Sequence, residues 1–200
     1  MKNTQTRRFI PCLLSVVAAA SLNTGCHVAT STRPIGNQSI SLAELPLEGV
    51  WRSSEGQPFF VRIVDAPTGR LEVANVTTNQ DGFLLERHEV ILRQQSGVTF
   101  ANLRSRDPNP DENYTFGRLM TQENTLILTL ASSASVRTLA LQGAAGAIIT
   151  TNQQSDGVSY SVIVTNGFEN LANRLAAPDG WQWLDTGNPI VLTRQKTGLN

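Results

Sequence analysis

The fold class of this chain is indicated most clearly by two stretches: residues 125–130, TLILTL, and residues 158–165, VSYSVIVT. In both, apolar side chains occupy every second position. Successive side chains of a strand point to opposite faces, so this alternation is typical of a strand with one buried and one wetter face. The alternating apolar residues are Leu126, Leu128 and Leu130 in the first stretch and Val158, Tyr160, Val162 and Val164 in the second.

Short apolar runs continue in both directions from these stretches. From Leu47 onward they are separated by turn signals at intervals of roughly 8–15 residues, a spacing that predicts an all-β sandwich or barrel. We expect a mainly β fold, an antiparallel meander that closes into a barrel-like domain. Gly, Asn and Asp at the turns tolerate the backbone angles that turns require. The predicted strands are 47–52, 59–64, 70–76, 86–94, 98–104, 113–121, 125–131, 147–151, 158–165 and 189–194.

One late helix is predicted over residues 166–177. Asn166 is expected to cap it, with Glu169 at the capping-box position, and Pro178 follows its end. A second, shorter helix is predicted over 133–142, with one more strand as the alternative. The apolar stripe of the late helix consists of Phe168, Leu171, Ala172 and Leu175.

The N-terminus has the layout of a secretory signal peptide. Three basic residues precede an apolar run over 9–22, which ends before Thr24, Gly25 and Cys26. The run is shorter than the ~20 residues that span a bilayer. We therefore expect residues 1–25 to be a signal peptide; the alternatives to lipid attachment after cleavage are ordinary secretion and a retained membrane anchor.

Cys26 after Thr24 and Gly25 resembles the lipobox of bacterial lipoproteins, although Asn23 stands where that family usually has Leu, Val or Ile. The resemblance implies a diacylglycerol on the Cys26 thiol and a third acyl chain on its amine, so that the partner is a membrane. His27, rather than Asp, follows the cysteine. By the same resemblance, the destination is the outer membrane of the cell envelope, facing the periplasm or the surface.

The expected organisation has three parts: the signal peptide 1–25, a lipidated cysteine with a flexible tether over 26–46, and a single β-barrel-like domain over 47–196. Residues 27–43 are rich in Ser, Thr, Asn and Gln. As a flexible coil, such a segment would reach roughly 20–25 Å, enough to clear the lipid headgroups.

The net charge argues against a nucleic-acid partner, and the cysteine content argues against a disulfide or a thiolate metal site. Removing Lys2, Arg7 and Arg8 with the signal peptide from the 16 basic residues leaves 13 against 16 acidic ones, a net charge of −3. No nucleic acid is therefore expected as a partner. Cys12 and Cys26 are the two cysteines. The expected domain thus has no disulfide and no thiolate metal site.

A second resemblance concerns both ends of the expected domain. Gly49-Val50-Trp51 on the first strand, an antiparallel meander and the late Arg194 resemble the lipocalin or calycin barrels, in which the Trp closes one end and the Arg packs over it. The resemblance implies structural roles for Gly49, Trp51 and Arg194. The stretch from Leu47 to Arg194 is also similar to a group of uncharacterised bacterial lipoproteins, which implies an envelope location.

Three polar residues are candidates for a ligand pocket. Asn102 and Arg118 stand among apolar residues at period two, a pattern that polar groups lining a barrel cavity would produce. Strand residues near an exposed rim, or a strand displaced by one residue, would give the same pattern. His88, between Glu86 and Glu89, is interpreted as a hydrogen-bonded wall residue, with a general base as the alternative.

No cofactor or metal is expected. The acidic loop 107–112 offers oxygen atoms of the kind that calcium prefers, but it lacks EF-hand spacing and carries two prolines, so a rigid turn is the favoured interpretation. Trp181 and Trp183 are expected to plug the core, or to touch lipid or glycan if exposed.

The expected function is that of a non-enzymatic, lipid-anchored envelope lipoprotein that binds a small apolar ligand or an envelope partner. The alternative is a structural or assembly lipoprotein with a filled core, which acts through its surface. An envelope hydrolase would need a catalytic constellation that the sequence does not display. A cavity of a few hundred Å³ would favour ligand binding, and close packing would favour the structural role.

Overall fold

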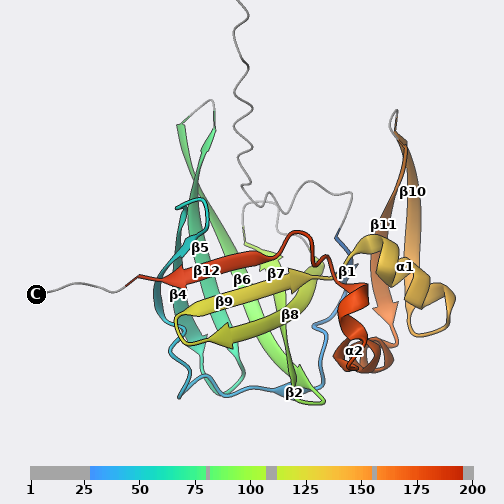
Figure 1. Cartoon of the computed structure of the whole chain (residues 1–200), viewed down its shortest axis with the longest axis horizontal. Coiled ribbons are helices and arrows are strands. Elements are labelled where there is room, and N and C mark those ends of the chain that lie inside the picture. The colour runs from blue at the N-terminus through green and yellow to red at the C-terminus, as the bar shows by residue number, and fades with distance from the viewer. Residues whose placement is uncertain (1–27, 80–81, 107–111, 155–156, 196–200) are drawn as a thin grey trace, which may run out of the picture.

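A computed structural model describes residues 28–79, 82–106, 112–154 and 157–195 (Figure 1). The expected signal peptide, Cys26 and most of the acidic loop lie outside these ranges. The strands are β1 (Thr30–Ser31), β2 (Gln38–Ser39), β3 (Gly49–Ser53), β4 (Pro58–Asp65), β5 (Arg70–Asn79), β6 (Gly82–Gln95), β7 (Val98–Ser105), β8 (Tyr114–Gln122), β9 (Thr125–Leu130), β10 (Gly146–Gln154), β11 (Gly157–Asn166) and β12 (Ile190–Arg194). The helices are α1 (Ser133–Leu141), α2 (Phe168–Ala176) and the 3₁₀ helix η1 (Gly180–Trp183).

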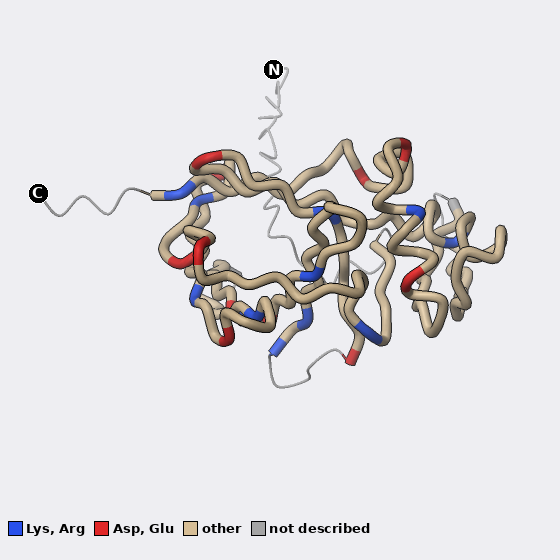
Figure 2. The backbone as a smooth tube through the Cα atoms, turned by 90° about the horizontal axis from the view of Figure 1, so that it is seen from below, with Lys and Arg blue, Asp and Glu red and all other residues tan. Residues whose placement is uncertain are grey.

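Eight strands form a closed antiparallel barrel. The strands from β3 to β9 pair with their neighbours in chain order, and β12 pairs with both β9 and β3. Figure 2 shows this ring of strands, with the rest of the chain to one side of it. The predicted mainly β, barrel-like fold with a late helix is thereby confirmed.

The β10–β11 hairpin lies outside the barrel, beside α1 and α2 (Figure 1). The short strand β1 joins it to the barrel, because β1 pairs antiparallel with β8 and parallel with β11. The alternation over 158–165 therefore correctly predicts a strand, β11, but this strand is not part of the meander.

The described residues form two hydrophobic cores. One fills the barrel, and the other lies between the barrel wall and the side unit of β10, β11, α1 and α2. Phe100 and Ala101 are adjacent in β7 and both buried, Phe100 in the outer core and Ala101 in the barrel. Because adjacent residues of a strand face opposite sides, one strand serves both cores.

The flexible tether expected over residues 26–46 is wrong for residues 28–46. Ala29, Ile35 and Leu42 are fully buried, and β1 and β2 pair with strands of the main sheet. The buried apolar residues of this segment stand far apart among polar residues, so they form no periodic pattern. Packing against the rest of the chain and backbone pairing of β1 and β2 hold residues 28–46 in place.

The second helix, α1, is confirmed, and its alternative as a strand is wrong. Val136 and Leu139, three residues apart, are both buried, as on one helical face. The late helix α2 is also present, but Asn166 does not cap it. Gly167 occupies the N-cap with φ +69°, while the Asn166 Oδ1 accepts a hydrogen bond from the Gly146 N–H at 3.0 Å. Among the described residues, no helix has the length and apolar character needed to cross a bilayer.

Candidate ligand cavity in the barrel

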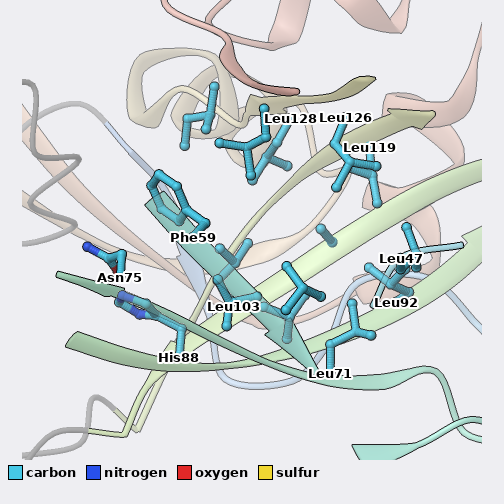
Figure 3. Close-up of a pocket in the computed structure, with 16 residues that line it drawn as sticks. Leu47, Phe59, Leu71, Asn75, His88, Leu92, Leu103, Leu119, Leu126 and Leu128 are labelled. Atoms are coloured by element: carbon cyan, nitrogen blue, oxygen red, sulfur yellow. The ribbon is translucent and has the colours of Figure 1, made fainter. Parts of the chain in front are cut away.

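The barrel encloses a cavity of about 110 Å³. Its wall consists of inward-facing side chains from the barrel strands, together with Leu47 just before β3 (Figure 3). Of the 16 residues that line it, Asn75 and His88 are the two polar ones, and the others are Leu, Val, Ile, Phe and Ala. Such a wall offers dispersion contacts to an apolar guest and few hydrogen bonds to water.

Trp51 belongs to the hydrophobic core inside the barrel. This side chain is buried, and its Nε1–H donates to the Leu47 carbonyl at 2.8 Å. The Arg194 guanidinium lies 5.9 Å from the centre of the Trp51 ring and donates to the Glu48 carbonyl at 2.9 Å. Gly49 has φ +134°, a region that side chains other than glycine's rarely adopt. The contact of Arg194 with the Trp51 ring is the part of the calycin resemblance that the structure shows; closure of a barrel end by Trp51 stays a prediction.

One end of the cavity is polar. Figure 3 shows Asn75 and His88 side by side at this end, away from Leu47 and Leu92. The Asn75 Nδ2 donates to one Glu86 carboxylate oxygen at 3.0 Å, and the Thr77 hydroxyl donates to the other at 3.5 Å. We call Asn75, Thr77, Glu86 and His88 the polar end. An apolar ligand tail in the cavity would place its own polar group here.

The structure does not bring the three predicted pocket residues together. His88 lines the cavity, whereas Asn102 and Arg118 do not. Both lie on the outer face of the barrel, beneath other parts of the chain. They are nevertheless buried, because β7 and β8 are covered on both faces. Period-two alternation identifies the residues of one face but does not say which face is inside.

Asn102 attaches the N-terminal segment to the barrel wall. Its Oδ1 accepts from the Ile35 N–H at 2.6 Å, and its Nδ2 donates to the carbonyls of Ile35 and Ile91, each at 3.1 Å. The side chain is fully buried, so these bonds satisfy groups that water does not reach.

Arg118 joins the barrel to helix α2. Its Nη2 donates to the carbonyls of Leu175 and Ala177 at the end of that helix, the latter at 2.9 Å. Its guanidinium also lies 4.5 Å from the centre of the Trp181 ring. Burial lowers the pKa of Arg118 from its usual value. Trp181 and Trp183 pack against the outer core, as expected for core-plugging side chains.

An ion-pair cluster lies on the outer wall. Glu89, which is buried, pairs with Arg70 at 2.5 Å, with Arg106 at 3.3 Å and with Arg104. Burial opposes ionisation of Glu89, but the hydrogen bonds and charges of Arg104 and Arg70 outweigh it and lower its pKa. Glu89 therefore stays charged and holds β5, β6 and β7 together from the outside.

Sequence reasoning missed Asn75. The signal was present, because Asn75 follows Leu71 and Val73 at period two in the same predicted strand. The 16 lining residues include no serine, threonine, cysteine, lysine or acidic residue, although Ser105 pairs with His88 across β6 and β7. Within the described ranges, no three His, Cys, Asp or Glu side chains are placed to hold a metal ion.

The fold and cavity define an eight-stranded antiparallel barrel with an apolar interior, consistent with a calycin-like fold. No family model, curated protein or solved structure matches the chain. The geometry alone therefore supports the assignment of the fold.

Proposed function

We propose that this chain is a lipid-anchored envelope lipoprotein whose barrel binds a small apolar ligand without catalysing a reaction. The observation that supports ligand binding is the apolar cavity, which is bounded at one end by Asn75 and His88. The ligand would place its apolar part among the leucines and valines and its polar group at the polar end.

The size of the cavity limits the ligand. Drug-sized molecules occupy pockets of about 300–1,000 Å³, whereas an apolar cavity of ~150 Å³ takes benzene. The cavity of about 110 Å³ is smaller than the few hundred Å³ expected of a ligand pocket, so a ligand would be limited to a segment of one alkyl chain or a small ring. Left empty, it would cost about 2–3 kcal/mol at ~24 cal/mol per Å³, a cost that a bound guest would offset.

Filling the cavity with protein atoms tests the ligand site. Ala101→Leu extends a side chain into the cavity, and we expect the affinity for a probe series of n-alkanols to fall at least tenfold by calorimetric titration, since about 0.8 kcal/mol is lost per displaced methylene contact. Ala74→Leu on β5, which does not line the cavity, is the matched control and should leave binding unchanged. Equal binding by wild type and Ala101→Leu would contradict the site.

The alternative is a structural or assembly lipoprotein that acts through its surface. It predicts that no alkanol binds and that Ala101→Leu changes only stability. The titration therefore separates the two functions with the same two variants.

The membrane anchor is tested independently of the cavity. If Cys26 is acylated, cells fed a clickable palmitate should label the protein, and Cys26→Ala should remove the label. Cys12→Ala is the control, because this cysteine lies within the expected signal peptide and should not affect labelling. An unlabelled wild type, or a labelled Cys26→Ala variant, would refute the anchor.

A further inference from the structure

Three consecutive apolar side chains are exposed on β6 near its turn with β5. Phe83 is 85% exposed, Leu84 47% and Leu85 55%. We call these three residues the apolar tip. A run of this kind on a soluble surface marks a site of contact with a protein or a membrane.

The apolar tip presents apolar side chains on both faces of β6. Phe83 and Leu85 point to one side, and Leu84 points to the other. Their partners on β5 carry no charge: Thr78 pairs with Phe83, Thr77 with Leu84 and Val76 with Leu85. A protein that stacks on a sheet would cover one face only, whereas a lipid phase surrounds both.

The apolar tip projects from the polar end of the barrel. Along β6 it lies three to five residues beyond His88, about 10–17 Å at ~3.3 Å per residue. In Figure 1 the β5–β6 hairpin extends past the body of the barrel. The charged residues Glu86 and Arg87 follow immediately toward the barrel. They limit how far along β6 an apolar environment could extend.

The described chain begins at the same end. His88 pairs with Ser105, the last residue of β7, so the polar end is level with the connection to β8. The first residues of β8 pair with β1, Tyr114 with Ser31, and Val28 bridges Ser132. Val28, the first described residue, therefore lies in the half of the molecule that carries the apolar tip.

We propose that the apolar tip inserts into the surface of a lipid bilayer, so that the polar end of the barrel faces the membrane. Insertion requires neither acylation of Cys26 nor a ligand in the cavity. If the proposed ligand binding also holds, an apolar guest would enter from the lipid side.

A site-specific fluorophore tests this orientation. In the full chain with Cys12→Ser and Cys26→Ser, an NBD label is attached at Phe83→Cys and, in a separate protein, at Leu141→Cys. Leu141 is 66% exposed at the end of α1, remote in sequence from the hairpin. Both proteins share the same N-terminal residues, so binding through those residues is equal in the two. Vesicles of phosphatidylethanolamine and phosphatidylglycerol, with and without nitroxide-labelled lipid, are then added.

We expect label emission at position 83 to shift to the blue and rise at least twofold on vesicles, and nitroxide lipid to quench it, while position 141 stays unchanged. No vesicle binding, or identical responses at the two positions, would overturn the proposal. A shift at position 83 that grows with protein concentration in the absence of vesicles would instead assign the apolar tip to a second copy of the chain. Phe83→Ser with Leu85→Ser, checked for native circular dichroism, should lower vesicle partitioning about tenfold or more.

Acylation, alkanol binding and insertion are measured separately. Loss of the vesicle response with retained alkanol binding would refute the orientation alone. Loss of alkanol binding with a retained vesicle response would refute the ligand site alone.

Discussion

Replacing Trp51 with Ala is expected to lower the free energy of unfolding by about 3–5 kcal/mol, the usual cost of removing a buried aromatic side chain. Trp51 is a buried member of the barrel core, and its loss leaves a void there. The substitution also removes the hydrogen bond to the Leu47 carbonyl and the ring beneath the Arg194 guanidinium. Urea denaturation followed by far-UV circular dichroism measures the effect.

Two controls separate these contributions. Trp51→Phe keeps most of the apolar volume but loses the Nε1–H donor, and should cost about 1–2 kcal/mol. Trp183→Ala removes a half-buried ring from the outer core and should cost less than Trp51→Ala. A loss below about 1 kcal/mol for Trp51→Ala would show that the ring does not support the barrel core.

Arg118→Met is expected to lower the free energy of unfolding by about 2–4 kcal/mol. The buried carbonyls of Leu175 and Ala177 would lose a charged donor, and removing one partner of such a bond costs about 1.5–3 kcal/mol. The contact with the Trp181 ring would add to this loss. Because Arg118 links β8 to the end of α2, amide hydrogen exchange should become faster in α2 than in wild type, while exchange in the barrel strands stays nearly unchanged.

Arg62→Met is the matched control. Arg62 carries the same guanidinium on an outer barrel face, but its side chain is 69% exposed and pairs with Glu72 at 2.5 Å. An exposed pair of this kind contributes about 0–1 kcal/mol. Equal losses in the two variants, or faster exchange throughout the barrel in Arg118→Met, would contradict a specific role at the α2 junction.

Much of the barrel could be predicted because its signals are local. Alternation at period two predicts β9 within the barrel and β11 outside it from neighbouring residues alone, and spaced apolar residues predict α1 and α2 beside the barrel. The Trp51 and Arg194 pairing was implied by resemblance, since a Gly-x-Trp strand and a late arginine are recognisable without knowing the path between them. By contrast, the cap of α2 was mispredicted, because Asn166 is used to bind Gly146, a residue 20 positions away.

The candidate site was predicted less completely. His88 was placed correctly in the wall, but Asn102 and Arg118 were assigned to the wrong side of it. In a strand with one exposed face, the other face points into the interior of the barrel. β7 and β8 have two buried faces, and no local pattern distinguishes the cavity from the outer core.

Apart from β1 and β2, the sequence by itself determined which stretches form strands and helices and which of their residues share a face, because those properties depend on backbone geometry over a few neighbouring positions. Only the tertiary structure decided that β11 lies outside the barrel, that residues 28–46 pack against it, and that Asn75 rather than Asn102 meets the cavity. Each of these depends on pairing or burial between segments far apart in the chain, and the free energy of such contacts is not encoded in any short stretch.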